Sequence, residues 1–409
     1  MTRDRYHSLR NAVKLVDDND VLIDEKREDA FWKVRPLLNA VQQECHRTPR
    51  AAYVSIDEQM VPFHGKVEMR QYVRGKPNPV GLKNFVLATP DGIPLDFTMY
   101  AGKGCTIKGA VVCEDLDSGG KVVLKLCQSL QAGTCIFTDR YFTSVALLDE
   151  LLQHGISGCG TLMRSRVPAA NKLRSESQLK KGGRGTSEQV VRSDGAVSLV
   201  QWYDSRQVLV ASTMFGKEPV TTCRRWCKKT KRYITVERPD ALTKYNAFMG
   251  GVDQLDRCIS MYRSRTRTNT WTLRMVFQMF DFACAAAWVR YCRSMQSKGK
   301  NPKEILDYLD FRMRVAEGLI YVQDIVETSD SSTDEDTPGS RKPFLPLPPP
   351  KKRSCGALHL PEMGTTQKAR SRCRLPGCKA LTAVRCKECK IFLCFNGSRN
   401  CYKGFHTQK

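Results

Sequence analysis

The chain has 409 residues, 41% of them hydrophobic, which is enough for two or three domains with buried cores. It has no apolar run of about 18 residues or more and no apolar N-terminal segment, so neither a membrane span nor a secretory signal is expected. Its formal net charge of +24 predicts nucleic acid as a polyanionic partner, in preference to a merely basic soluble surface or an acidic membrane.

Residues 1–48 are predicted to be helical. Acidic and basic residues alternate in this segment, and the amphipathic run Ala30–Gln43 is interrupted by Pro36. The segment is too short to be a full domain. We therefore expect a truncated N-terminal region, or a helical segment that braces a larger domain.

Residues 49–163 have an α/β pattern. Short β-rich segments are separated by turn sequences such as Gly75–Pro79, and such short connections are typical of antiparallel neighbours. A β-α-β unit follows them. The expected strands are Ala51–Ile56, Met69–Val73, Lys83–Ala88, Leu95–Tyr100, Thr134–Thr138 and Gly158–Met163, and the expected helices are Val122–Leu130 and Ser144–His154. This order of elements is the one used by ribonuclease H-like cores, and we expect that fold.

Residues 164–240 are predicted to be an insertion that contains some β-structure. Arg164–Arg192 is basic and rich in Gly and Ser, so we expect a mobile loop there. Two strands are expected, at Leu199–Tyr203 and Gln207–Ser212. A second basic run, Arg224–Arg232, contains Trp226.

Residues 241–326 are expected to complete the core with helices at Lys244–Met261, at Trp271–Met295 and at Lys303–Ala316, the last opened by Pro302. Residues 327–369 are first acidic and then Pro-rich, which predicts a disordered linker. Residues 370–409 form a small Cys-rich domain.

Two carboxylates, Asp57 and Glu58, follow the first predicted strand, and Pro62 and Gly65 turn the chain after them. A strand end is a usual place for a metal ligand, because the strand is rigid and the adjoining loop leaves room for a substrate. Taken alone, however, an Asp at this place is more often only a turn or cap residue.

Partners for Asp57 occur downstream. Asp139 follows the predicted strand Thr134–Thr138, and two glycines precede Asp253 and Asp256, which lie one turn apart on one helix face. Three such carboxylates can hold two divalent cations about 3.5–4 Å apart. Oxygen ligands select hard cations, so we expect Mg²⁺, or Mn²⁺ as a substitute. Such a pair activates water or a 3′-hydroxyl for in-line displacement at a phosphodiester.

Three motifs carry a family resemblance: SIDEQMVPFHGKVEMRQYVRGKPNPVGLK, then FTDRYFTS, then YNAFMGGVDQLD followed by YRSRTRTNTW. Together they resemble the transposases of the piggyBac family and their domesticated derivatives, over residues 28–296 and the Cys-rich end. The resemblance implies a catalytic metal-binding triad of Asp57, Asp139 and Asp253, with Asp256 as a further acidic ligand, whereas Glu58 is not carried over. It also implies a homodimer that cuts double-stranded transposon ends, closes them as hairpins and joins them at TTAA targets.

Basic residues beside the acidic motifs are candidates for DNA contacts. Alternate arginines after the third motif can hold phosphates against the metals, and a nearby Trp can stack on an unpaired base. The alternative is that these arginines are solvated and the Trp belongs to the core. The predicted DNA-binding residues are Arg224, Arg225, Arg263, Arg265, Arg267 and Trp271.

The Cys-rich end is too short to fold on a hydrophobic core alone, so zinc thiolates are expected to stabilise it. Seven ligands exceed one tetrahedral site, which predicts two Zn²⁺ ions in a cross-brace similar to the C-terminal domain of the family. Cys355, His359 or a water could supply the eighth ligand. Free thiols, or a zinc module that binds protein rather than DNA, are the alternatives. The predicted ligands are Cys373, Cys378, Cys386, Cys389, Cys394, Cys401 and His406.

The main hypothesis is a metal-dependent DNA transposase, and the rival is a catalytically silent DNA- or chromatin-binding protein that keeps the fold. The family has a longer helical N-terminal region, so the chain is expected to be a fragment, an alternative start or a trimmed host-adopted protein. Pro350–Arg353 (PKKR) could serve nuclear import or be a plain solvated linker. If this segment serves nuclear import, we expect the protein in the nucleus.

Overall fold

The computed structural model describes residues 2–102, 113, 115–167, 173–321, 347–348, 353, 359–363 and 371–407. The chain divides into two compact units, Met1–Ile325 and Val326–Lys409. Within the described ranges, no helix is both long and apolar enough to cross a membrane. Most of the predicted linker at 327–369 lies outside the described residues, and so does Cys355.

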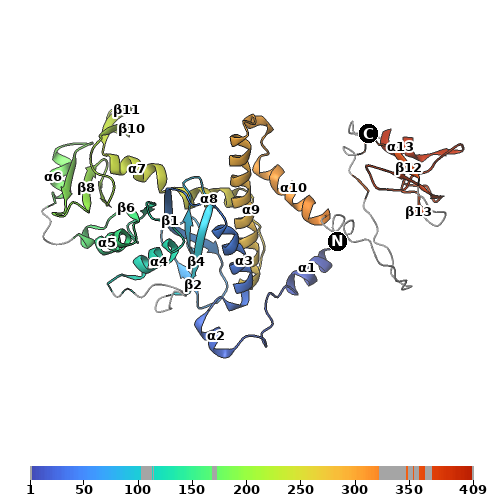
Figure 1. Cartoon of the computed structure of the whole chain (residues 1–409), viewed down its shortest axis with the longest axis horizontal. Coiled ribbons are helices and arrows are strands. Elements are labelled where there is room, and N and C mark those ends of the chain that lie inside the picture. Colours follow the sequence, from blue (N-terminus) through green and yellow to red (C-terminus); the bar gives the residue numbers. More distant parts are fainter. Residues whose placement is uncertain are drawn as a thin grey trace. The chain divides into compact units, whose positions relative to one another are not determined.

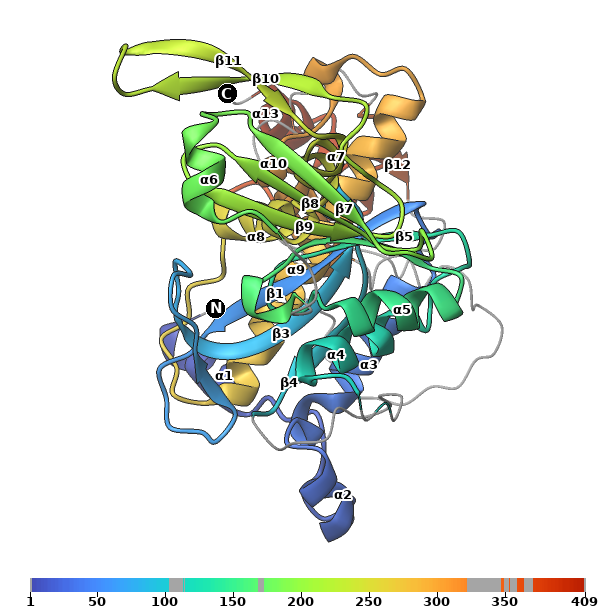
Figure 2. The ribbon, with the colours of Figure 1, turned by 90° about the vertical axis from the view of Figure 1, so that its left-hand side faces the viewer.

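A nine-stranded mixed sheet runs through the first unit (Figures 1 and 2). β1, β5 and β6 are parallel, β3 lies antiparallel beside β1, and β2 and β4 share the other edge of β3. β9 pairs antiparallel with β6 and continues into β8 and β7, so the predicted insertion extends the same sheet. The strands are β1 (Tyr53–Pro62), β2 (Arg70–Tyr72), β3 (Val80–Ala88), β4 (Pro94–Tyr100), β5 (Cys135–Thr138), β6 (Ser157–Thr161), β7 (Ser187–Val191), β8 (Ser198–Tyr203) and β9 (Gln207–Ser212).

Helices cover both faces of the central strands, and consecutive residues of a strand point to opposite faces. On β3, Val86 packs in the cluster formed with α3, α8 and α9, whereas Phe85 packs in the cluster formed with α4 and α5. Figure 1 shows these two helical layers on either side of the strands. Their bounds are α3 (Arg35–His46), α4 (Ser118–Cys127), α5 (Val145–Gln153), α8 (Gly251–Met261) and α9 (Trp271–Ser297).

Two predicted boundaries near the acidic residues are wrong. The strand predicted at Ala51–Ile56 continues to Pro62 because it stays paired with β3, so Asp57 lies inside a strand and not at its end. The helix predicted over Lys244–Met261 is instead two helices, α7 (Asp240–Phe248) and α8, which the chain separates at Met249 and Gly250.

Pro36 was predicted to interrupt a helix and Pro302 to open one, but both lie at the start of a helical turn. Pro36 lies in the first turn of α3, where its missing N–H has no helical acceptor to lose, so it does not interrupt the helix. Pro302 opens only a short 3₁₀ turn, Pro302–Glu304, and α10 (Tyr308–Tyr321) begins after it. The helical prediction for the N-terminal segment is confirmed by α1 (Arg3–Asn11), α2 (Ile23–Glu28) and α3.

The insertion contains more regular structure than predicted. The segment Arg164–Arg192, expected to be a mobile loop, includes α6 (Glu176–Lys181) and β7. A capping box between Ser175 and Gln178 fixes the start of α6. The basic run forms a separate hairpin, β10 (Thr221–Cys227) and β11 (Arg232–Arg238).

The described part of the second unit contains short strands and the helix α13. Its buried cluster combines several cysteines with apolar residues such as Leu393 and Phe405. Its elements are β12 (Pro361–Met363), β13 (Ser371–Arg372), β14 (Leu381–Thr382), β15 (Val384–Cys386), β16 (Phe395–Asn396), β17 (Arg399–Asn400) and α13 (Cys401–Thr407).

Candidate functional site

Asp57 and Asp139 lie where two neighbouring parallel strands separate. The last parallel pair of β1 and β5 joins Ile56 to Thr138, and each acid is the next residue along the chain. Asp57 continues along β1, and its Oδ1 accepts a hydrogen bond from the following N–H at 2.7 Å. Asp139 enters the turn before α5, where its Oδ1 accepts a backbone N–H at 2.9 Å. Both carboxylates therefore lie at the same end of the segment over which β1 and β5 are paired.

Asp253 comes from the first turn of α8, which packs very closely against the core strands. A Cβ on Gly251 would lie 2.3 Å from the carbonyl oxygen of Thr89 and 2.7 Å from Oγ of Ser55, so only glycine allows this approach. Asp253 is close enough to Asp57 to raise its pKa. The structure therefore brings together the three acids of the predicted triad.

Burial controls the ionisation of the acidic site. It raises the pKa of Asp57 to about 7, with Asp139 and Asp253 adding to the effect and Lys76 opposing it. Burial also raises the pKa of Asp139, and it raises the pKa of Asp256 to about 6. The site therefore holds carboxylates whose negative charge is costly unless a cation compensates it.

Asp256 lies one turn after Asp253 and is held by a neighbouring strand. Its Oδ1 accepts a hydrogen bond from Nε2 of Gln59 on β1 at 2.7 Å. Gln59 is buried, and its Oε1 lies 3.4 Å from Nε2 of Gln278 on α9. These amides fix α8 against β1, and the sequence analysis did not single them out.

Lys76, in the loop between β2 and β3, is a further residue that the sequence analysis missed. Its Nζ lies 3.9 Å from Oδ1 of Asp57 and 3.8 Å from Oε1 of Glu58, and it donates to the Glu58 carbonyl oxygen at 3.1 Å. The Glu58 carboxylate also has a second partner, the buried Nζ of Lys83, at 2.7 Å. A single lysine in a turn sequence gives no local signal of such a contact.

The donor set of the acidic site suits hard divalent cations, because it consists of carboxylate oxygens. Within the described parts of the chain, only two clusters in the second unit place three or more ligand atoms within 4.8 Å of one another. The three Asp carboxylates are therefore more widely spread than the ligands of a single compact ion.

An arginine-lined cavity of about 820 Å³ lies beside the third acidic motif. It is bounded by Phe63 and His64 after β1 and by the loop that begins at Arg263 and leads into α9. Arg263, Arg265, Arg267 and Arg274 all line it, so three of the predicted DNA-binding residues converge on one space. Such a set of guanidinium groups is suited to binding phosphate groups.

Two other predicted DNA contacts are engaged inside the protein. Trp271 is partly buried in the main core, and its ring meets Phe31 edge to face at 5.9 Å. Arg225 faces inward on β10, where its Nε lies 3.1 Å from Oδ2 of Asp204. Arg224, in contrast, is on the exposed face of the hairpin.

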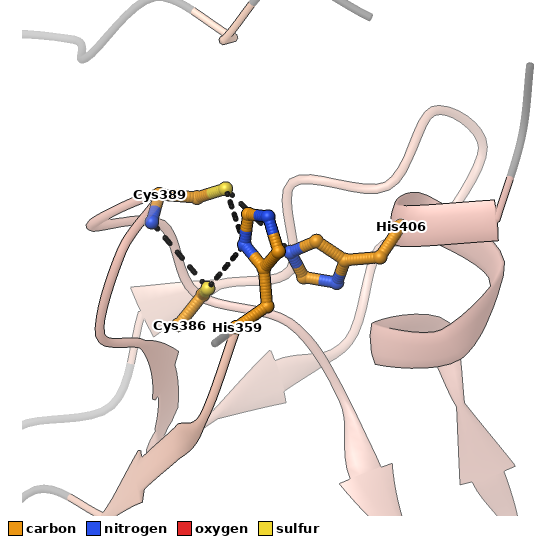
Figure 3. A group of neighbouring side chains, drawn as sticks. All are labelled: His359, Cys386, Cys389 and His406. Carbon is orange, nitrogen blue, oxygen red and sulfur yellow. Dashed lines mark hydrogen bonds between the residues drawn. The ribbon is translucent and has the colours of Figure 1, made fainter. Parts of the chain in front are cut away.

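Six cysteines and two histidines of the second unit form two groups of four possible metal ligands, as Figure 3 shows for one of them. One group contains His359, Cys386, Cys389 and His406, and the other contains Cys373, Cys378, Cys394 and Cys401. The groups alternate along the chain, which is the arrangement of a cross-brace. Tetrahedral sites of thiolate and imidazole ligands suit Zn²⁺.

His359 lies where the eighth candidate ligand, left open by the sequence, is needed. Its Nδ1 lies 3.5 Å from Sγ of Cys386 and 3.4 Å from Sγ of Cys389. On the other side, Nε2 of His406 lies 3.5 Å from Sγ of Cys389, while Nδ1 of His406 contacts the carbonyl oxygen of Tyr402 at 2.8 Å. That second contact orients the ring, as is usual for metal-binding histidines.

Comparison with known proteins assigns the family. Residues 1–288 match the family model described as transposase IS4. A cryo-EM structure of a piggyBac transposase synaptic complex with hairpin DNA superposes with a TM-score of 0.63 at 21% identity, covering 96% of this chain and 79% of that one. The chain thus has the mixed α/β fold of a transposase, and it belongs to the transposase IS4 family, in its piggyBac type.

Human relatives support the same assignment. PiggyBac transposable element-derived protein 3 of Homo sapiens is 30% identical over 414 residues, which cover 100% of this chain and 64% of the relative. The human chimeric ERCC6-PGBD3 protein is also 30% identical over 100% of the chain, which covers 36% of that protein. PiggyBac transposable element-derived protein 2 of Homo sapiens is 28% identical over 80% of the chain and 53% of its own length. The chain thus spans less than two thirds of each of these relatives.

Proposed function

We propose that the protein is a piggyBac-like DNA transposase, or a domesticated derivative, that cleaves and transfers DNA strands at TTAA sites with divalent metal ions. The observation that carries this proposal is the convergence of Asp57 in β1, Asp139 just after β5 and Asp253 in α8. The strand order β4-β3-β1-β5-β6, with β1 parallel to β5 and β6, supports a ribonuclease H-like core.

In this proposal, the three Asp carboxylates and Asp256 hold two Mg²⁺ or Mn²⁺ ions. When bound, the ions supply Lewis acidity at the phosphodiester and lower the pKa of the attacking water or 3′-hydroxyl. The guanidinium groups of Arg263, Arg265 and Arg267 hold phosphates in the neighbouring cavity. The ammonium group of Lys76 compensates Asp57 and Glu58, which keeps the carboxylates together before ions bind.

The test is nicking of a TTAA-flanked DNA end by the full chain in Mg²⁺ and in Mn²⁺. We expect Asp57→Asn, Asp139→Asn and Asp253→Asn each to abolish nicking while DNA binding persists. Asp24→Asn, which changes an exposed acid on α2, is the matched control and should nick normally. Nicking by the Asp57→Asn protein at the rate of the unaltered protein would refute the assignment.

The second candidate is a catalytically silent DNA- or chromatin-binding protein. It is favoured by the contact of Lys76 with Asp57, since a lysine can replace a metal as the counter-charge of a carboxylate. DNA binding without nicking in either metal would select this candidate.

We further propose that the second unit binds two Zn²⁺ ions and contacts DNA. The protein acts as a homodimer on double-stranded DNA in the nucleus. Of the basic segment proposed for nuclear import, Pro350, Lys351 and Lys352 lie outside the described residues. Import of a reporter fused to that segment, compared with one carrying neutral replacements of its lysines, tests the location.

A further inference from the structure

The β10–β11 hairpin has an exposed aromatic pair near its tip. Trp226 and Tyr233 are directly opposite each other in the antiparallel register, and they are 49% and 62% exposed. Their ring centroids are 5.2 Å apart at an interplanar angle of 71°, and the guanidinium carbon of Arg224 lies 5.0 Å from the Tyr233 ring. The hairpin projects beyond β8 in both ribbon views (Figures 1 and 2).

Several cationic residues lie between the two aromatic residues along the hairpin. The turn of the hairpin carries Lys228, Lys229 and Lys231, and β11 begins with Arg232; all four are exposed. Together with Arg224, they form no ion pair with any residue that the structure describes. The hairpin tip, defined as Arg224, Trp226, Tyr233 and residues 228–232, thus combines two partly exposed aromatic rings with five positive charges.

The inner face of the hairpin anchors it firmly to the first unit. The Glu237 carbonyl oxygen accepts a hydrogen bond from Nε1 of Trp202 on β8 at 2.7 Å. The Trp226 carbonyl oxygen accepts one from Nη1 of Arg184 at 3.0 Å, and Arg184 pairs with Asp204. Because the base is fixed in this way, the exposed tip is presented in a defined orientation rather than on a loose loop.

We propose that the hairpin tip is a second nucleic-acid contact, at which the Trp226 ring stacks on an unpaired base, supported edge to face by Tyr233, while Lys228, Lys229, Lys231 and Arg232 bind the flanking phosphates. This inference rests on the proposed DNA function and adds the structure of the DNA that is recognised. Aromatic side chains stack on any base, because every base has a π-face, and cations beside them attract the backbone. The five uncompensated charges favour nucleic acid over a protein partner.

The purely structural alternative is a cross-strand pair that only stabilises the hairpin. This role would change thermal stability but would not discriminate between forms of DNA. The two roles are therefore separated by comparing an intact duplex with the same duplex carrying a short single-stranded gap.

The experiment measures fluorescence anisotropy of both labelled DNAs with the full chain. The unaltered protein is expected to prefer the gapped duplex. The double variant Trp226→Ala/Tyr233→Ala should bind the gapped duplex about 5- to 100-fold more weakly and the intact duplex almost normally. Tyr72→Ala, which removes an exposed aromatic from β2, is the matched control and should change neither affinity.

The charges are tested separately by Lys228→Ala/Lys229→Ala/Lys231→Ala. This variant should weaken binding of both DNAs and reduce the salt dependence by about two to three phosphate contacts. Equal affinities of the aromatic variant and the unaltered protein for the gapped duplex would overturn the inference, even where duplex binding persists. Failure of the unaltered protein to bind either DNA would overturn the proposed function itself. Tight binding to phosphatidylserine vesicles in place of DNA would assign the tip to a membrane.

Discussion

Replacing Asp57 with Asn is expected to stabilise the metal-free protein while abolishing its activity. The Asp57 side chain is only 15% exposed, and its pKa is raised from an ordinary value of 3.8 to about 7. Because of this difference, ionisation of Asp57 lowers the free energy of unfolding at pH 8 by about 4 kcal/mol. Asn has the same shape, and its Oδ1 can still accept the N–H of Glu58.

The expected gain is somewhat smaller than this limit, because Asp57→Asn also removes a partner of Lys76. Lys76 keeps its contacts with Glu58, so we expect a net gain of about 2–4 kcal/mol at pH 8. For a unit of about 325 residues, this gain raises the melting temperature by about 3–6 °C. Because the fold raises the pKa of Asp57 to about 7, it favours the protonated form of this side chain over the ionised form. The penalty is therefore absent below pH 4, grows as the pH rises, and is complete above pH 7.

The assay is denaturation with a chelator present at pH 5 and at pH 8, and Glu58→Gln is the control of opposite sign. Glu58 is the adjacent acid, but its carboxylate lies 2.7 Å from Nζ of Lys83, whose side chain is 8% exposed. Removing this charge leaves a buried lysine unpaired and should destabilise the protein by about 3–5 kcal/mol. The reasoning is refuted if Asp57→Asn is no more stable than the unaltered protein at pH 8, or if the two substitutions act in the same direction.

Three further outcomes are expected. Gly251→Ala should destabilise the first unit by about 1–3 kcal/mol, since its Cβ would lie 2.3 Å from the Thr89 carbonyl oxygen, whereas Gly250→Ala meets no atom within 4 Å and should be tolerated; unfolding curves compare them. His359→Ala should lower zinc from two to one per chain, and Cys378→Ala should do the same through the other cluster; elemental analysis that finds no zinc in the unaltered protein would contradict the cross-brace. Mg²⁺ should raise the melting temperature more at pH 8 than at pH 6, because it binds ionised carboxylates; an equal shift at both values would count against the acidic site.

The closely spaced candidate ligands could be predicted from the sequence, whereas the eighth could only be narrowed to Cys355, His359 or a water. Six cysteines and His406 are close together along the chain, so their number alone indicated two tetrahedral sites. His359 lies upstream of them, next to residues that give no spacing signal. Its contact with Cys386 and Cys389 depends on the pairing of β12 with β15, which brings the two segments together in space.

The end of the strand that carries Asp57 could not be predicted from the sequence, for a different reason. Its polar residues, among them Asp57, Glu58 and Gln59, suggest that the strand stops after Ile56, because buried strands are usually apolar. The backbone remains paired with β3 as far as Pro62, and the polar side chains are satisfied by partners distant in sequence. Gln59, for example, binds Asp256 across 197 positions. Such contacts are determined by tertiary packing, which no local pattern contains.

The difference between Asp57 and Glu58 explains why only one of two adjacent acids is a candidate ligand. They alternate along β1, so their side chains leave opposite faces of the strand. Glu58 meets the buried ammonium group of Lys83, which is itself stacked against the ring of Tyr141 at 4.4 Å, and its charge is compensated. Among the described residues, the one cation paired with Asp57 is the more distant Lys76, and two other carboxylates repel Asp57. A charge that the fold buries without sufficient compensation is the one that a divalent cation would stabilise most, so we expect a metal ion at Asp57 rather than at Glu58.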